Sequence, residues 1–186
     1  FPKVIPLGVF LKIFPSFLLS NIFFKYFPEN EFSLVLVAYN LRCNLLMQKL
    51  KNFLYNSSGL ISANILVGSY LPDWRPQTDY RQSYSARKKE GGGVLRDLSH
   101  ELDYVLWLFG PWRWITAAGG HLSSLEIDSD DVFSLILATD RCPLVSVHMN
   151  YLDRVPCRKI LVNTNNDTIC VDIIKNIFHI NISVKQ

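Results

Sequence analysis

Several motifs that would identify a metal-binding, redox or nucleotide-binding protein are absent from the sequence. The four cysteines, Cys43, Cys142, Cys157 and Cys170, form no C-x-x-C pair and have no histidine at zinc-finger distance, so neither a metal site nor a redox motif is predicted. No G-x-G-x-x-G motif is present, so the glycine-rich loop that holds a dinucleotide pyrophosphate in a Rossmann domain is missing. The net charge of +3 is too small to indicate a nucleic-acid partner.

The composition is that of a folded globular protein. Hydrophobic residues make up 49% of the 186 residues and charged residues 19%, which excludes a disordered chain and fits one domain, or one domain and a fragment of another. Residues 1–30 are predicted to be a hydrophobic leader or a truncated remnant. Within them, residues 4–24 are long enough to span a bilayer, but Pro6, Lys12 and Pro15 interrupt the run. We expect a cytoplasmic protein, with membrane association through residues 4–24 as the alternative.

The stretch Glu90–Pro111 combines an amphipathic helix with a defined stop. Apolar residues at helical spacing predict one buried stripe, formed by Val94, Leu95, Leu98, Leu102, Val105, Leu106 and Phe109. Asp97, His100 and Tyr104 are expected together on the opposite face, close enough to serve one site. The pair Gly110–Pro111 ends the helix, because glycine accepts the left-handed conformation after the last turn and proline cannot continue a helix.

Three glycines, Gly91–Gly93, precede this helix and would let the backbone approach a ligand closely, without a Cβ atom in the way. A glycine-rich loop before an amphipathic helix is also common where no site exists, and an Asp/His pair on a solvated helix face usually has no function. Periodicity alone therefore leaves both interpretations open.

The remaining periodic segments predict an α+β fold. Residues 32–39 form a nearly continuous apolar run, typical of a strand buried on both faces of a parallel sheet, and residues 45–55 form a short amphipathic helix. Further strands are expected over residues 61–70, 114–123, 132–139, 144–151, 158–162 and 168–174, of which 144–151 alternates cleanly between apolar and polar residues. Because a run of strands follows the helices, we expect a largely antiparallel sheet. Residues 175–186 show no clear pattern.

Residues 71–90 are predicted to form a polar, aromatic and basic loop. Trp74 can stack on a sugar or a base, and Arg75 and Arg81 offer planar donor groups for phosphate or carboxylate. The alternative is a surface loop in which the tryptophan packs on its own neighbours.

Three segments, in this order, resemble the Gfo/Idh/MocA oxidoreductases, a family of NAD(P)-dependent sugar and cyclitol dehydrogenases. Val37–Arg42 is similar to the end of the dinucleotide-binding domain of that family. Gly68–Pro76, together with Asp79–Arg81, is similar to the loop that leads toward the substrate. Gly91–Gly110 is similar to the signature helix of the family.

The resemblance implies an α+β domain with a largely antiparallel β-sheet and helices on one face, preceded by a remnant of an α/β Rossmann domain. Residues 31–43 would be the last strand of the Rossmann-like domain, and residues 44–186 the substrate-binding and oligomerisation domain. Most of the Rossmann domain, and the Glu-Lys-Pro motif of the family, have no counterpart in the sequence. A partner chain could supply that domain, and a homo-oligomer through the sheet face is expected.

The function implied by the resemblance is oxidation of CH–OH groups in a sugar or sugar nucleotide, with NAD or NADP as cofactor and weak or no activity of this chain alone. Histidine suits the proton-transfer step because its pKa lies near neutrality. His100 is therefore the expected acid/base and Asp97 its partner, although many family members separate these two by four positions and here the separation is three. The alternative is a non-catalytic sugar-binding or assembly module derived from the family.

The resemblance also implies residues that contact the ligands. They are Trp74, Arg75, Tyr80, Arg81 and Tyr104 for the substrate, and Tyr39, Asn40 and Arg42 for the cofactor. The cofactor site is expected to be incomplete, because the phosphate-binding loop is missing.

Overall fold

The computed structural model describes residues 3–5 and 38–182. The apolar run over residues 4–24 and the strand predicted over residues 32–39 therefore lie almost entirely outside the described residues. Within the described ranges, no helix combines the length and the hydrophobicity needed to cross a membrane.

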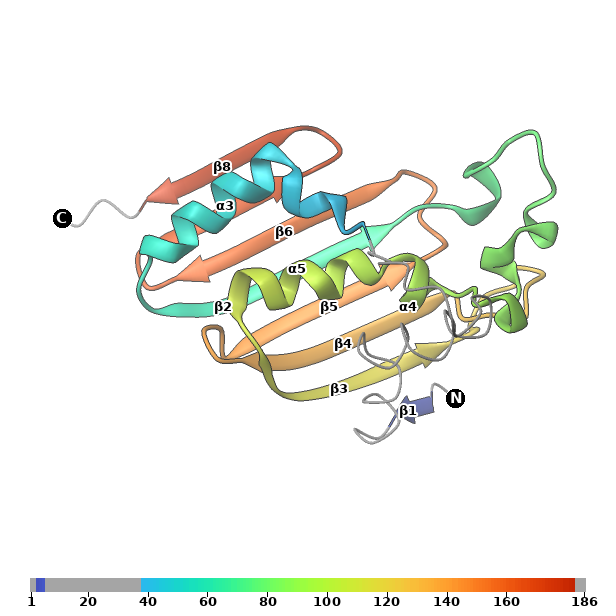
Figure 1. Cartoon of the computed structure of the whole chain (residues 1–186), viewed down its shortest axis with the longest axis horizontal. Coiled ribbons are helices and arrows are strands. Elements are labelled where there is room, and N and C mark those ends of the chain that lie inside the picture. The colour runs from blue at the N-terminus through green and yellow to red at the C-terminus, as the bar shows by residue number, and fades with distance from the viewer. Residues whose placement is uncertain (1–2, 6–37, 183–186) are drawn as a thin grey trace, which may run out of the picture.

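One mixed β-sheet forms the body of the described chain, and two helices, α3 (Leu45–Asn56) and α5 (Ser99–Phe109), cover one of its faces (Figure 1). Strands β2 and β5 run parallel, and every other neighbouring pair is antiparallel. The predicted α+β fold, with a largely antiparallel sheet and helices on one face, is confirmed. From edge to edge the strands are β1 (Lys3–Ile5), β3 (Trp112–Gly120), β4 (Val132–Thr139), β5 (Leu144–Asn150), β2 (Leu60–Gly68), β6 (Cys157–Thr164), β7 (Asp167–Asp172) and β8 (Ile177–Ile182).

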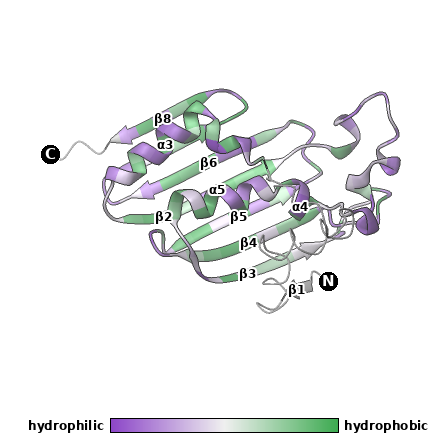
Figure 2. Cartoon of the chain, viewed as in Figure 1, coloured by the Kyte–Doolittle hydropathy of each residue, from purple (hydrophilic) through white to green (hydrophobic). Residues whose placement is uncertain are grey.

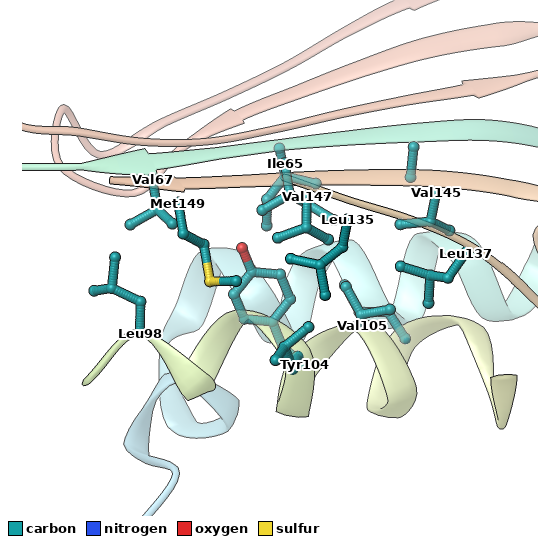
Figure 3. Close-up of a cluster of buried hydrophobic side chains, with 14 of the residues drawn as sticks. Ile65, Val67, Leu98, Tyr104, Val105, Leu135, Leu137, Val145, Val147 and Met149 are labelled. Carbon is teal, nitrogen blue, oxygen red and sulfur yellow. The ribbon is translucent and has the colours of Figure 1, made fainter. Parts of the chain in front are cut away.

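The core lies between the helices and the covered face of the sheet. Val145, Val147 and Met149 of β5 point toward the helices and are at most 1% exposed, as the alternation in this segment predicts. Figure 3 shows them facing α5, where Val105 lies beneath the strands. Helix α3 adds fully buried side chains at helical spacing, namely Met47, Leu50 and Leu54. Figure 2 shows apolar residues along the central strands and polar residues on both helices, which bury only their inner sides.

The opposite face of the sheet carries no helix of the described chain and mixes polar with apolar side chains. Ser134 is hydrogen-bonded to His148 Nδ1 at 2.7 Å, and Ser146 donates to Asn64 Oδ1 at 2.6 Å. Between these pairs lie large apolar side chains that are 44–48% exposed, namely Leu66, Trp114, Ile136 and Leu144. Apolar side chains spread over a sheet face suit contact with another protein surface.

Strand β8 occupies a segment in which the sequence shows no pattern. Phe178 and Ile180 are half-buried, while Ile177, His179 and Asn181 are exposed. The strand lies at the edge of the sheet and pairs only with β7. Because neither side of an edge strand of this kind is fully buried, its alternation between polar and apolar residues is weak.

Arg141 is hydrogen-bonded to the C-terminal ends of both α3 and α5. Its guanidinium donates to the carbonyl oxygen of Leu54 at 2.5 Å and to that of Leu108 at 3.4 Å, and its backbone N–H donates to the Phe109 carbonyl at 3.1 Å. Carbonyls in the last turn of a helix have no partner in a following turn and carry the negative end of the helix dipole. The Leu54 carbonyl also accepts a hydrogen bond of 3.3 Å from the backbone N–H of Ser57. We expect Arg141→Met to lower the free energy of unfolding by about 1–3 kcal/mol in urea denaturation.

Arg113→Met is the matched control for Arg141→Met. Arg113 pairs with Asp140 at 3.0 Å, but both side chains are more than half exposed, so its loss should change stability by less than about 1 kcal/mol. Equal effects of the two substitutions would show that Arg141 contributes no more than a surface charge.

Candidate functional site

The helix predicted over residues 94–109 is two helices in the structure. Helix α4 (Val94–Asp97) and α5 are separated by Leu98, whose φ of −101° and ψ of 27° are not helical. Gly110 ends α5 with a φ of 86°, which confirms the predicted stop. Because of the break, the spacing of a continuous helix does not relate Asp97 to His100.

The glycine triplet before α4 packs against other parts of the protein. A Cβ atom on Gly92 would lie 2.1 Å from the carbonyl oxygen of Tyr84, and one on Gly93 would lie 2.4 Å from Asp130 Oδ1. Asp130 accepts a hydrogen bond of 3.0 Å from the backbone N–H of Leu95 and so caps α4. These two glycines therefore allow close packing of α4 on two loops, which differs from the ligand approach considered from the sequence.

His100 is half-buried in the first turn of α5. Its ring lies edge-on to that of Tyr39, with 5.4 Å between the ring centroids. Its Nδ1 atom is buried and has no hydrogen-bond partner among the described residues. Burial lowers the pKa of His100 below its usual value, and the positive charge of Arg158 lowers it further, whereas Asp103 raises it. At neutral pH the imidazole is therefore uncharged and able to accept a proton.

Asp97 has a different partner from the one expected. Its Oδ2 atom accepts a hydrogen bond of 2.6 Å from the hydroxyl of Tyr151, and within residues 38–182 no hydrogen bond joins it to His100. Burial and the negative charge of Asp97 raise the pKa of Tyr151, so the phenol stays protonated and acts as the donor. The expected direct support of His100 by Asp97 is thus not seen.

Tyr151 also fixes the start of the 71–90 loop. Its ring lies perpendicular to that of Trp74, with 5.3 Å between centroids, and the Trp74 indole N–H donates to Ser69 Oγ at 2.7 Å. The Arg75 guanidinium lies 5.9 Å from the centre of the Tyr84 ring. Trp74 thus packs on its own neighbours, as in the second interpretation of this loop.

Tyr80 and Arg81, also predicted to bind substrate, both contact Glu126. Arg81 Nε lies 2.9 Å from Asp79 Oδ1, and its Nη1 lies 2.6 Å from Glu126 Oε2. The Tyr80 hydroxyl accepts a hydrogen bond of 3.2 Å from the backbone N–H of Glu126. The structure does not bring these two side chains into contact with His100.

The residues predicted to bind cofactor attach the segment before α3 to α5. Arg42 makes a two-pronged ion pair with Asp103, through Nε at 2.8 Å and Nη2 at 2.6 Å. Tyr39 lies against His100, and the Asn40 side chain is exposed. Of Tyr39, Asn40 and Arg42, the structure therefore brings Tyr39 into contact with His100.

The prediction that Tyr104 lies on the exposed face beside Asp97 and His100 is wrong. Tyr104 is fully buried, and Figure 3 shows its hydroxyl pointing from α5 toward the sheet beside Met149. The physical reason lies within α5, where Tyr104 is three positions after Glu101 and four before Leu108, both fully buried, so it belongs to the stripe that packs on the sheet.

Glu101 and Arg158 form a buried ion pair that the sequence analysis missed. Glu101 is fully buried, and its Oε1 atom lies 2.9 Å from Arg158 Nε, although the N–H is not aimed well enough for a hydrogen bond. Burial raises the pKa of Glu101 to about 7, and Arg158 opposes this shift. The spacing of Glu101 from Val105 and Leu108 places it on the buried side of α5, and this signal could have identified it.

Proteins of similar fold are known from solved structures. The WlbA dehydrogenase from Bordetella pertussis, in complex with NADH and UDP-GlcNAcA, matches with a TM-score of 0.66 at 20% identity over 81% of this chain and 44% of its own. The UDP-N-acetylglucosamine 3-dehydrogenase GnnA from Acidithiobacillus ferrooxidans gives 0.62 at 16% identity over 81% and 44%. Levoglucosan dehydrogenase, in complex with NADH and levoglucosan, gives 0.67 at 15% identity over 85% and 45%. The chain thus spans less than half the length of these proteins.

A comparison with curated protein sequences finds no match. The family model described as the GFO/IDH/MocA C-terminal domain matches residues 57–166, more than half of the 186 residues. The matched range begins before β2 and includes α4, α5 and the strands β3 to β6. The chain therefore belongs to the Gfo/Idh/MocA oxidoreductase family.

Proposed function

We propose that this chain is the substrate-binding part of an NAD(P)-dependent oxidoreductase that acts on a sugar or sugar nucleotide, with His100 as the residue that transfers the proton. The observation that carries the proposal is the uncharged, half-buried imidazole of His100, whose Nδ1 atom has no partner among the described residues. Solved structures of similar fold include dehydrogenases with NADH and UDP-GlcNAcA or with NADH and levoglucosan, which supports the substrate class.

The chemistry assigned to His100 is acid/base transfer at a sugar hydroxyl. A neutral imidazole accepts the hydroxyl proton as the carbinol is oxidised and returns it in the reverse direction. The nicotinamide, when bound, supplies the hydride chemistry. Asp103 lies one turn after His100 and is fixed by Arg42, and it favours the protonated imidazole that forms during the reaction.

Of the residues predicted to bind the cofactor, Tyr39 lies against His100, the proposed proton-transfer residue. A phosphate cradle is not found among the described residues, because Gly92 and Gly93 pack against protein atoms and Arg42 is paired with Asp103. We therefore assign pyrophosphate binding to a Rossmann domain outside the described residues, on the same polypeptide or on a partner chain.

The open face of the sheet is the surface we assign to self-association. Its apolar side chains include Leu66, Trp114 and Ile136, and they lie on three of the central strands. A homo-oligomer through this face would remove them from water. Sedimentation of the purified chain, compared with a Trp114→Lys variant, tests this arrangement.

The catalytic assignment predicts a large effect of His100→Ala on turnover. In a system reconstituted with a dinucleotide-binding domain and NAD⁺ or NADP⁺, which accepts the hydride from the carbinol, we expect kcat to fall by roughly 10²- to 10⁴-fold, with a much smaller change in substrate affinity. His179→Ala, at the exposed edge strand β8, is the control and should retain full activity.

Unchanged turnover in His100→Ala would contradict the catalytic assignment. Binding of a sugar nucleotide without any turnover in the reconstituted system would favour the alternative, a non-catalytic sugar-binding or assembly module.

A further inference from the structure

Arg158 presents a positive charge at the margin of the proposed site. It is the second residue of β6, opposite Val67 of β2, and its side chain lies on the helix-covered face of the sheet with Glu101. The side chain is 24% exposed, and its Nε atom lies 2.9 Å from Glu101 Oε1. Its terminal nitrogens donate no hydrogen bond to any described residue.

Several buried polar atoms of Arg158 and of helix α5 have no hydrogen-bond partner among the described residues. Within the described chain they are Arg158 Nε, both carboxylate oxygens of Glu101, the Tyr104 hydroxyl and His100 Nδ1. The positive charge of Arg158 lowers the pKa of His100 and opposes the rise in the pKa of Glu101 and of Tyr104. Arg158 Nε and Glu101 Oε1 face each other at 2.9 Å. Because buried polar atoms in proteins are almost always hydrogen-bonded, we expect polar groups of a ligand or of water at the other three atoms, Glu101 Oε2, the Tyr104 hydroxyl and His100 Nδ1.

We propose that Arg158 anchors a negatively charged group of the substrate, either a carboxylate or a phosphoryl group, next to His100. This inference rests on the proposed function and narrows the substrate class to sugar acids and nucleotide sugars. With Nε placed against Glu101, the two terminal nitrogens keep the planar arrangement that binds an oxyanion through parallel hydrogen bonds. A neutral sugar offers only hydroxyl groups to the same nitrogens.

The charges around Arg158 favour an anion. Asp103 is paired with Arg42 and not with Arg158, and His100 is uncharged at neutral pH. Glu101 faces Arg158 directly, but burial raises its pKa to about 7, so it carries only part of a negative charge under these conditions. Glu101 therefore neutralises Arg158 only in part, and a substrate anion can pair with the positive charge that remains.

Calorimetric titration of the chain with glucose, glucuronate and UDP-glucose tests the anchor. A carboxylate anchor gives glucuronate the higher affinity, whereas a phosphoryl anchor gives UDP-glucose the higher affinity. In either case we expect the charged sugar to bind roughly 10- to 100-fold more tightly than glucose.

The variants must keep the fold intact, because removing Arg158 alone would leave the buried Glu101 unpaired. The double variant Glu101→Gln/Arg158→Gln removes both charges and should bind the charged sugar no more tightly than glucose, while Glu101→Gln alone should keep the preference. Arg154→Gln is the matched control. It removes the same charge four positions earlier, from a side chain stacked 3.4 Å from the centre of the Tyr70 ring, and should also keep the preference.

Three results would overturn the assignment of Arg158. They are equal binding of all three compounds, no binding of either charged compound, and a loss of preference in Arg154→Gln as large as in the double variant. This result is separable from the proposed function. Turnover that depends on His100 without any preference for an anion would contradict the anchor alone, and an anion preference with unchanged turnover in His100→Ala would contradict the catalytic assignment alone.

Discussion

Glu101→Gln is expected to make the protein more stable at pH 8 than the unsubstituted chain, by up to about 3 kcal/mol. The pKa of Glu101 is raised from 4.5 in the unfolded chain to about 7 in the fold. Between these values the folded chain holds a proton that the unfolded chain has released, so the free energy of unfolding falls as the pH rises from 4.5 to 7. Glutamine keeps the shape of the protonated acid and does not titrate, so the variant should not show this loss.

Urea denaturation of both proteins at pH 5 and pH 8 measures the effect. The stability difference between them should be small at pH 5 and close to its full value at pH 8. Glu126→Gln is the control, because this glutamate is 68% exposed and should not change stability between these pH values. A parallel fall in the stability of the original chain and of Glu101→Gln would contradict a raised pKa at this position.

Gly92→Ala is expected to lower the free energy of unfolding by about 3 kcal/mol. The added methyl group would lie 2.1 Å from the Tyr84 carbonyl oxygen and 2.5 Å from the Ser85 carbonyl oxygen, and both are backbone atoms that cannot rotate away. Either the loop before α4 or α4 itself must shift. Thermal and urea denaturation of the purified variant measure the loss.

The neighbouring substitution Gly91→Ala separates crowding from backbone strain. A Cβ atom at Gly91 would meet nothing within 4 Å, and its φ of 89° alone should cost about 1 kcal/mol. If the glycines served ligand approach and not packing, both variants would retain nearly full stability and lose only ligand binding. Similar, small losses in both would therefore rule out the packing role.

The strands with one fully buried face were predictable because the helices bury every second residue. The segment over residues 144–151 shows this best, since Val145, Val147 and Met149 alternate with polar residues and are buried as predicted. Strand β8 could not be predicted in the same way, because an edge strand with half-buried residues leaves little alternation in the sequence. The apolar spacing also predicted a helix over residues 45–55, and α3 spans Leu45–Asn56.

The candidate site was less predictable, because its geometry depends on contacts distant in sequence. Asp130, which caps α4, lies 35 residues after the Leu95 N–H that it binds. Tyr151, which donates to Asp97, lies 54 residues after it, directly beyond the end of β5. Neither contact has a local signal, and together with the break at Leu98 they determine where Asp97 lies. The burial of Glu101 could be predicted from its spacing in α5. Its pairing with Arg158 could not, because the folded sheet brings β6 to α5 from 57 residues away in the sequence.

The position of β2 in the sheet has a consequence for synthesis of the chain. β2 lies between β5 and β6, so Ser62 pairs with Leu144, and Ala63 pairs with Val162. On the ribosome this strand therefore emerges with both edges unpaired, and it stays so until residues 144–164 have followed. Contacts so distant in sequence slow folding, and unpaired edges promote association with other chains. The yield of folded protein should therefore depend on how quickly residues 144–164 are synthesised and pair with β2.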